Sequence, residues 1–335
     1  MKTCRQQQEE FEEITLAPQA MRSACSAGRK RYEEPCTVRT CYQRDIDRIV
    51  HSKAFRRLKH KTQVFLQPEG DHYRTRMTHT IEVMRIARTL ARSLRLNEDL
   101  AEAIAWGHDL GHTPFGHAGE RALDEICPMG FTHNRQSLRV VDTLEKNGKG
   151  LNLCMEVRDG ILNHTGPSDP HTLEGKIVRL SDRIAYISHD MDDAVRAGIL
   201  KPSDIPKEIV EATGNNYSGR LNAAIVDVIE TSRDSGDVNM SPDMFMIMER
   251  FRNFLFERVY RNPVAKGEEI KIKGILEKLY DHYMTNQNLL PADYLSLLEQ
   301  NNADRIVCDY IAGMTDKYAI YVYDDLFIPE AWQVR

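Results

Sequence analysis

The amino-acid sequence predicts an all-α fold, an irregular bundle of many helices. Two observations carry this prediction. From residue 78 to residue 327, most segments between turn residues place their apolar side chains three or four positions apart, which is helical spacing. Only Thr62 to Leu66 is rich in β-branched and aromatic residues, and Pro68-Glu69-Gly70 follows it. We therefore expect one small β-hairpin near residues 62–75 in an otherwise helical chain.

The elements can be taken in chain order. Residues 1–40 are polar and contain Pro18, Gly28 and Pro35, so we expect an irregular lead-in there. From Asp45 to Leu58 the apolar residues share one helical face. The helices expected after the hairpin are 78–94, 99–108, 116–125, 135–146, 154–163 and 173–197.

Pro202, Pro206 and the Gly-Asn-Asn turn at 214–216 mark a boundary. Beyond it we expect helices 221–232, 242–260, 272–285, 292–298 and 304–327. The sequence thus predicts three parts: a lead-in over 1–40, a core over 41–202, and a helical extension over 203–335. We expect the extension to pack on the core and not to form an independent domain.

Length, charge and cysteine usage narrow the class of protein. A chain of 335 residues can bury a sizeable core, and its net charge of −5 argues against nucleic acid as the main partner. No run approaches the ~18 consecutive apolar residues of a membrane span, and Met1 to Glu13 lacks a secretory signal. The seven cysteines show no CxxC spacing, so we expect reduced thiols and a cytoplasmic protein.

One local cluster of positive charge departs from the acidic average. Basic residues crowd between Lys53 and Lys61, and Arg74 and Arg76 follow closely. Such a cluster is either a solvated helix face or a pocket for a polyanion. We interpret Arg56, Arg57 and Arg76 as polyanion ligands and the remaining residues as a solvated face.

A set of histidines and aspartates predicts a metal site. His108 and Asp109 are adjacent at the end of an expected helix, and imidazole nitrogen with carboxylate oxygen suits Mn, Fe or Zn. His79 opens the helix 78–94. Asp182 lies among apolar residues of the helix 173–197, where burial is costly without a partner. Each alone is more often a surface or capping residue, but together they predict one divalent-metal site built from three helices.

Further residues beside this set suggest acid–base chemistry and substrate contacts. His117 and Glu120 are three apart on a helix face, and a carboxylate beside an imidazole is a common general-base arrangement. The alternative for Glu120 is a first-turn acid favoured by the helix dipole. Tyr186 and Asp190 share one helical stripe with Asp182 and could face a substrate. Their alternatives are a core tyrosine and a solvated acid.

Several short sequence motifs resemble those of one known family. They are Phe55–Leu58, Lys61–Phe65, Asp71–His79, His108–His117, Phe131–Arg139, Asp182–Ala194 and Met314–Ala319. The His…His-Asp…Asp set is similar to the HD superfamily of metal-dependent phosphohydrolases. The motifs Gly-His-Thr-Pro-Phe-Gly-His and His-Asn-x-Gln resemble, more narrowly, those of its deoxynucleoside triphosphate triphosphohydrolase branch, the deoxyguanosine triphosphatase-like proteins.

The resemblance implies an HD-domain enzyme that hydrolyses deoxynucleoside triphosphates, dGTP or several dNTPs, to deoxynucleoside and inorganic triphosphate. It implies one divalent cation per site, with Mg, Mn or Fe expected and Zn, Ni or Co possible. A second metal at His112 is the alternative, but dinuclear relatives usually carry further histidines at other spacings. The resemblance also implies a homo-oligomer, a hexamer or lower, and a possible allosteric nucleotide.

The family's functional residues carry over position by position. His117 and Glu120 match its catalytic pair, and His112 and His133 match histidines that line the phosphate-bearing site. Tyr186 matches a ring that fills the space of a ribose 2′-hydroxyl, and Asp190 matches an acceptor for the 3′-hydroxyl. The remaining matches are Gln63 for sugar or base and Arg252 for phosphate.

Two other hypotheses about the function compete with dNTP hydrolysis. A nucleotidase or cyclic-nucleotide phosphodiesterase of the same superfamily would keep the metal site and change the substrate. A nucleotide-sensing or nucleic-acid-binding regulatory protein would carry a degenerate site. The complete metal set and the His117–Glu120 pair argue against degeneracy.

Overall fold

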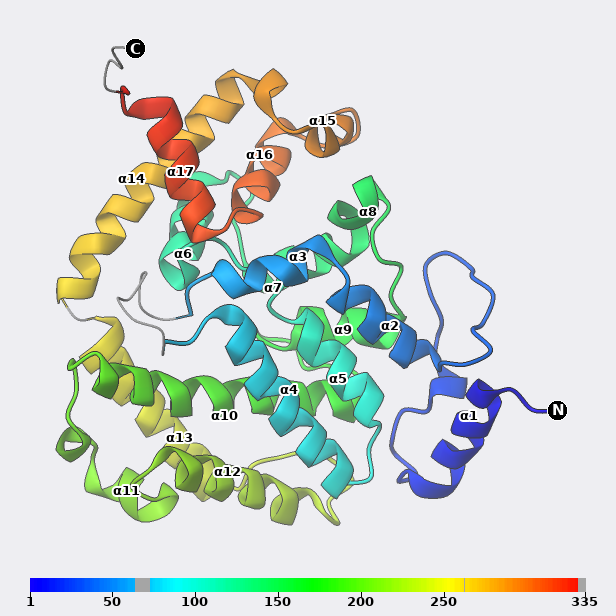
Figure 1. Cartoon of the computed structure of the whole chain (residues 1–335). Helices are drawn as coiled ribbons and strands as arrows, with labels where there is room; N and C mark the ends of the chain where they lie inside the picture. The colour runs from blue at the N-terminus through cyan, green and yellow to red at the C-terminus, as the bar shows by residue number, and fades with distance from the viewer. Residues whose placement is uncertain (64–72, 262, 331–335) are drawn as a thin grey trace, which may run out of the picture.

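Helices account for the regular structure of the described chain (Figure 1), and no named strand occurs in it. The computed structural model describes residues 1–63, 73–261 and 263–330, with residues 263–269 described as helix without their side chains. Two hydrophobic clusters hold the helices together. The larger cluster is formed by residues of the helices in the middle and lower part of Figure 1, and the smaller one by residues of α6 and the C-terminal helices α14 to α17.

The N-terminal segment contains a helix that the sequence analysis did not predict. Helix α1 (Cys4–Thr15) begins at Thr3, whose side chain accepts from the Gln6 N–H in a capping box. Its one buried residue is Glu12, whose carboxylate accepts from the Ser23 N–H and hydroxyl at 2.7 Å each. Because α1 is fixed by its cap and polar contacts, hydrophobic spacing gave no sign of it. The expectation of an irregular segment over 1–40 was wrong here.

The core is built from α2 (Cys41–Val50), α3 (Lys53–Arg57), α4 (Arg76–Ser93), α5 (Glu98–Gly107), α9 (Met155–Asn163) and α10 (Leu173–Arg196). The single helix expected from Asp45 to Leu58 is two, because Ser52 caps α3 by accepting the Phe55 N–H. Helices α4, α5 and α10 pack together at the centre (Figure 1). Gly160 lets α9 approach α5, since a Cβ there would lie 2.5 Å from Ile104 Cδ1.

The small β-hairpin expected near residues 62–75 is not supported. Among the described residues of this segment, Thr62 and Thr75 form one isolated antiparallel bridge and no strand. Residues 64–72, which include the expected strand end and turn, lie outside the described residues. Thr75 instead caps α4, because its side chain accepts the Thr78 N–H.

Residues 108–115, the His-rich segment, connect α5 to the first of two short helices, α6 (Gly116–Ile126) and α7 (His133–Arg139). The longer helix expected over 135–146 changes to a π-helical turn at Val140–Leu144. It then ends in α8 (Glu145–Gly148), inside which Lys146 and Asn147 have positive φ. Side-chain spacing alone does not report such a change of helix type.

The C-terminal part is helical, as expected, with different boundaries. Its helices are α11 (Lys207–Thr213), α12 (Tyr217–Ser232), α13 (Pro242–Leu255), α14 (Pro263–Thr285), α15 (Ala292–Leu298), α16 (Ala303–Ala312) and α17 (Asp316–Phe327). Helix α11 was not predicted, and a π-helical turn, Phe256–Tyr260, follows α13. The single helix expected over 304–327 is two, because Thr315 caps α17 by accepting the Tyr318 N–H.

A disulfide joins the two parts of the smaller cluster. Cys127, at the end of α6, is bonded to Cys308 of α16, 181 residues later in the chain. The other five cysteines are free. The expectation that all seven are reduced was wrong, because the packing that brings this pair together leaves no trace in cysteine spacing.

The start of α17 is tied to the His-rich segment. Asp316 accepts from the Phe115 N–H at 2.9 Å, from the Thr62 N–H at 3.0 Å and from the Thr62 hydroxyl. The buried ammonium of Lys61 donates to the carbonyl of His112 and, at 2.8 Å, to that of Ala312. Residues 312–316 therefore hold the backbone of the segment 112–115 in place.

We expect Asp316→Ala to destabilise the protein by about 3 kcal/mol. The substitution leaves two backbone N–H groups and a hydroxyl buried without an acceptor, each at a cost of about 1–3 kcal/mol in part relieved by water. Urea unfolding would measure the change. Asp324→Ala, which removes an exposed acid of the same helix, is the matched control. Equal midpoints for the two variants would contradict a stabilising role for Asp316.

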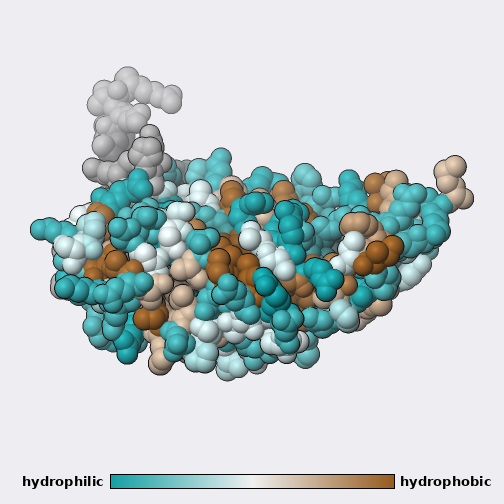
Figure 2. Space-filling model, turned by 90° about the horizontal axis from the view of Figure 1, so that it is seen from below, coloured by the Kyte–Doolittle hydropathy of each residue, from teal (hydrophilic) through white to brown (hydrophobic). Residues whose placement is uncertain are grey.

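On the face seen from below, hydrophobic residues lie in separate groups among hydrophilic ones (Figure 2). The exposed large apolar side chains of α12 and α13 are Val226, Phe245 and Met246. Within the described residues, no helix is both long enough and apolar enough to cross a membrane.

Candidate metal centre and active site

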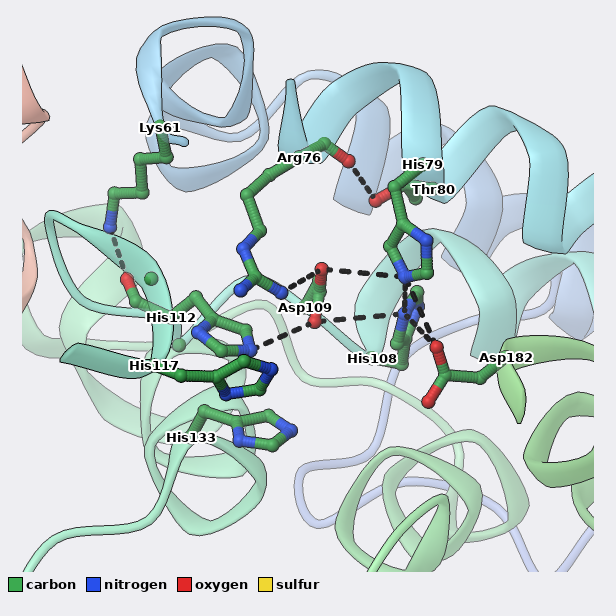
Figure 3. Close-up of polar contacts among 12 residues, drawn as sticks. Lys61, Arg76, His79, Thr80, His108, Asp109, His112, His117, His133 and Asp182 are labelled. Carbon is green, nitrogen blue, oxygen red and sulfur yellow. Dashed lines mark hydrogen bonds and ion pairs between the residues drawn. The ribbon is translucent and has the colours of Figure 1, made fainter. Parts of the chain in front are cut away.

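Four side chains predicted as metal ligands meet at one point (Figure 3). His79 comes from the first turn of α4, His108 caps the end of α5, Asp109 follows it, and Asp182 lies in the middle of α10. His79 Nε2 lies 3.1 Å from Asp182 Oδ1 and 3.8 Å from Asp109 Oδ2. His108 Nε2 lies 3.6 Å from Asp109 Oδ1 and 3.9 Å from Asp182 Oδ1.

The two imidazoles turn the same nitrogen toward this point. His108 Nδ1 lies 2.7 Å from the Ala105 carbonyl, which can only accept, so Nδ1 carries the proton and the Nε2 lone pair is free. His79 Nδ1 is bonded to His189 Nε2 at 2.9 Å. The two Nε2 atoms face each other at 3.4 Å. Backbone and side-chain partners thus orient both rings with Nε2 toward this point, as a metal ligand would require.

The spacing and charge of the four groups fit a divalent cation. Ligands about 2.0–2.2 Å from a metal lie about 3–3.5 Å from one another, close to the distances found here. Burial raises the pKa of both carboxyls. Arg76 and three histidines outweigh burial at Asp109, and His79, His108 and His164 outweigh it at Asp182, so both pKa values lie well below the usual range. His79, His108 and Asp109 form a group spaced to hold a metal ion, and Asp182 Oδ1 lies within 3.9 Å of both imidazoles as a fourth candidate ligand.

Arg76, predicted to bind a polyanion, lies buried beside this centre. Its Nη1 donates to Asp109 Oδ2 at 3.1 Å and its Nε to the Thr62 carbonyl at 3.2 Å. Its Nη2 has no acceptor among the described residues, so one donor stays available for an anion. The same charge opposes a second cation on Asp109, although Asp109, His112 and His133 have ligand atoms within 4.8 Å of one another.

A second group of side chains lies next to the metal ligands. His112 stacks on His133 with ring centroids 4.1 Å apart, and its Nε2 lies 3.4 Å from Asp109 Oδ1. Glu120 Oε1 accepts from the His133 N–H at 2.7 Å and contacts His133 Nδ1 at 2.8 Å. His117 is 61 % exposed, and its Nδ1 lies 3.6 Å from Glu120 Oε2. Glu120 thus contacts both histidines, and its contact with His133 is the shorter one.

The charges in this second group are unequal. Burial raises the pKa of Glu120, but bonds to His117 and His133 outweigh it and leave the carboxyl well below its usual range. Burial lowers the pKa of His133, but Glu120 outweighs burial and raises it above the ordinary value. Burial and the nearby charges of Arg76 and His133 hold the pKa of His112 well below its usual range. Glu120 thus favours the protonated form of His133, whereas the surroundings of His112 favour its neutral form.

The predicted sugar-contacting residues extend from the metal centre along α10. Tyr186 is half-buried one turn beyond Asp182, and burial raises its pKa to about 12. Asp190 is buried a further turn on, where it accepts from the hydroxyl of Tyr260 and lies 2.7 Å from His189 Nδ1. Gln63 is also buried, and its Oε1 has no partner among the described residues.

The predicted phosphate-binding arginines differ in their positions. Arg252 is 52 % exposed, lies 3.4 Å from Glu249, and its charge acts on Tyr186 and Tyr260 near the site. Arg57 is half-buried, and its charge acts on Lys61. Arg56 is exposed and donates to the His51 carbonyl, so no contact joins it to the metal ligands.

Two basic residues expected on a solvated face are not solvated. Lys61 is buried and bonded to the carbonyls of His112 and Ala312, as described above. Arg74 is half-buried and pairs with Glu82 and Asp193 at 3.0 and 2.8 Å. The sequence shows a cluster of like charges, but it does not show the acceptors that distant segments supply.

Sequence reasoning missed two buried histidines and one tyrosine of this site. His164 lies beside His133 and His108, and His189 bonds His79. A spacing signal existed for both: His164 follows Ile161 by three positions on the apolar face of its helix, and His189 follows Asp182 by seven. Tyr260 reaches Asp190 from a π-helical turn far along the chain, and nothing in the sequence indicated it.

The chain is similar to two protein families and to several curated proteins. The HD domain family matches residues 76–187, and the phosphohydrolase-associated domain matches residues 238–325. A "deoxyguanosinetriphosphate triphosphohydrolase-like protein" of Caldanaerobacter subterraneus is 53% identical over 97% of this chain and 96% of its own length. Proteins of the same name from Desulfatibacillum aliphaticivorans and Clostridium tetani are 49% and 43% identical, over 98% and 97% of this chain and 99% and 97% of theirs.

Among solved structures, a phosphohydrolase of Bacteroides thetaiotaomicron has a similar fold, with a TM-score of 0.53. The two are 17% identical, and the match covers 84% of this chain and 68% of that one.

Proposed function

The chain belongs to the deoxyguanosinetriphosphate triphosphohydrolase-like proteins, phosphohydrolases with an HD domain, and we propose that it hydrolyses deoxynucleoside triphosphates to deoxynucleoside and inorganic triphosphate. One observation carries the proposal. Tyr186 and Asp190 lie one and two turns beyond Asp182 on α10, so a sugar held by them has its 5′-oxygen and α-phosphate near the metal ligands. The names of the relatives support the same substrate class.

The metal, when bound by His79, His108, Asp109 and Asp182, would polarise the phosphate nearest the sugar and lower the pKa of a water. We expect Mg, Mn or Fe. The free Nη2 of Arg76 and a protonated His133, the form that Glu120 favours, would attract the negative oxygens of the phosphate chain. We assign the outer phosphates to Arg252, whose side chain is 52 % exposed.

Attack of water on the α-phosphorus forms one phosphorus–oxygen bond and breaks the bond to the sugar oxygen. The water loses a proton, and the departing oxygen gains one. We assign this proton transfer to His117, whose ring is exposed, with the carboxylate of Glu120 orienting it. His112, held neutral, lines the phosphate side and does not compete for the proton.

Product analysis tests the proposal. The purified protein would be incubated with each dNTP and each ribonucleotide in Mg or Mn, and early products would be resolved by chromatography. We expect nucleoside and triphosphate, with heavy oxygen from labelled water recovered in the triphosphate. Monophosphate with pyrophosphate as the first products would instead place the protein in another hydrolase class, and a cyclic nucleotide or a monophosphate as preferred substrate would favour the phosphodiesterase or nucleotidase alternative.

We expect Tyr186→Ala to reduce discrimination against ribonucleotides by roughly 10–200-fold, which corresponds to contacts of about 1–3 kcal/mol. We propose that the half-buried ring fills the space that a 2′-hydroxyl would need beside Asp190. The ratio of kcat/KM for dGTP to that for GTP measures the effect, and Tyr321→Ala, an exposed tyrosine of α17, is the control. A wild-type protein that hydrolysed both equally well would contradict the steric argument.

Assembly into a homo-oligomer, a cytoplasmic location and control by a second nucleotide stay predictions.

A further inference from the structure

His164 is a buried histidine between the two halves of the site. It caps the end of α9, and only 2 % of its surface is exposed. Its ring lies edge-on to His108, with centroids 5.1 Å apart, and tilted against His133, with centroids 5.2 Å apart. It is not among the groups of side chains spaced to hold a metal in the described chain. A buried polar ring needs another reason for its position.

The hydrogen bonds of His164 determine where its protons lie. Nδ1 is 2.7 Å from the carbonyl oxygen of Ile161, which only accepts, so Nδ1 carries a proton. Nε2 is 3.2 Å from Nε2 of His133. One of these two nitrogens must donate and the other must accept, since two N–H groups or two lone pairs would repel.

The neighbours of the two rings decide which nitrogen donates. If His164 donated, it would be an imidazolium buried against a carbonyl, and His133 would be neutral. If His133 donates, the positive charge lies on the ring whose Nδ1 is 2.8 and 3.1 Å from the two oxygens of Glu120. A buried charge is far less costly beside a carboxylate than beside a neutral carbonyl. His133 is therefore the donor at both nitrogens.

Charged and titratable groups reach His133 from every element around it. They are Glu120 and His117 on α6, Asp109 and His112 after α5, Arg76 on α4 and His164 on α9. The two carboxylates favour the charged ring, and Arg76 disfavours it. Among the described residues, His164 is the neighbouring imidazole whose ring nitrogen is hydrogen-bonded to a ring nitrogen of His133.

We propose that His164 is a positioning residue that accepts a hydrogen bond from His133 and so keeps His133 doubly protonated, with its positive charge toward the phosphate groups of the substrate. The inference rests on the proposed function for the identity of the anion. The inferred protonation state of the His133 ring does not depend on the proposed function. A lone pair opposite His133 Nε2 stabilises the charged ring, and its loss lowers the pKa of His133.

Binding of inorganic triphosphate to the metal-loaded protein tests the role of His164. His164→Leu keeps the bulk and removes the acceptor, whereas His164→Gln can place a side-chain oxygen near the lost nitrogen. At pH 7.5, set above the ordinary histidine pKa of about 6.5, we expect His164→Leu to weaken triphosphate binding by about 10–100-fold, as for a lost charge-assisted hydrogen bond. We expect His164→Gln to restore most of it.

The pH dependence gives the second readout. As pH rises through the pKa of His133, its charge and the binding are lost, and in His164→Leu this loss should begin at a lower pH. His171→Leu, which changes an exposed histidine that pairs with Asp159, should behave as the wild type. Metal content is measured in every variant, because His164 also touches His108. Unchanged binding and pH dependence in His164→Leu would overturn the proposal, and so would a loss explained by lost metal.

Nitrogen-15 spectra of histidine-labelled wild-type protein test the same point without substitution at His164. The signals of His133 are identified by their absence in His133→Gln. Above the ordinary histidine pKa, both ring nitrogens of His133 should still be protonated. A neutral His133 there would overturn the inference even if dNTP hydrolysis is confirmed. A doubly protonated His133 in a protein that hydrolyses no dNTP would leave the inference standing and remove the proposed function.

Discussion

Replacing His108 with alanine is expected to remove the bound metal and to lower hydrolysis by roughly 10³-fold or more. The Nε2 lone pair of His108 is one of four donors at the centre, and the Ala105 carbonyl fixes its direction. A metal contributes several kcal/mol to the stabilisation of charge in the transition state, and each 1.36 kcal/mol corresponds to tenfold in rate. Elemental analysis and steady-state rates, measured on the same preparation, would show both effects.

The helical fold should survive this substitution. His108→Ala removes the buried imidazole ring and its hydrogen bond to the Ala105 carbonyl, a cost of about 2–5 kcal/mol that a domain of this size tolerates. Circular dichroism would check this, and His51→Ala, an exposed histidine at the end of α2, is the control. Full metal occupancy in purified His108→Ala would remove His108 from the ligand set.

Replacing Glu120 with glutamine is expected to lower kcat by about 10²–10⁴-fold, the usual contribution of a proton-transfer group. The amide has nearly the same shape as the carboxylate but cannot balance the charge of His133 or orient His117 in the same way. Metal content should stay unchanged, because Glu120 contacts none of the four proposed ligands. This separates the effect from that of His108→Ala.

Glu125→Gln is the matched control for this experiment, since Glu125 lies on the same helix α6 and pairs with Lys273 on the surface. It should retain wild-type rates. A Glu120→Gln protein with more than about a tenth of the wild-type kcat would assign Glu120 to the structure of the helix start and not to proton transfer.

The central helices and the metal set were predictable because both depend on local pattern. Apolar spacing places α4, α5 and α10, and His79, His108 and Asp182 fall on faces of these helices that must be buried. The pattern also gives α9, although the importance of His164 at its end was not recognised. These inferences needed no knowledge of which segments touch.

The rest depends on contacts between distant segments, which single-sequence patterns do not contain. Helix α1 was missed because its cap and a buried Glu12 hold it, not an apolar stripe. Lys61 was read as a solvated charge because its acceptors lie 51 and 251 residues away. The disulfide and the Tyr260–Asp190 bond were invisible for the same reason.

Phe115 adopts a left-handed backbone conformation, with φ 64°, directly before the helix that carries His117 and Glu120. A bulky residue in this region costs about 1–3 kcal/mol, and its N–H is held by Asp316 from the other end of the chain. The strained turn is thus held in place by a hydrogen bond to Asp316, at the start of α17. Warming that breaks this hydrogen bond would let the turn relax while the central helices persist. Activity should therefore be lost at a lower temperature than the circular-dichroism signal of the helices. The upper temperature limit of activity is then set by the local stability of this turn and not by the unfolding temperature of the whole protein.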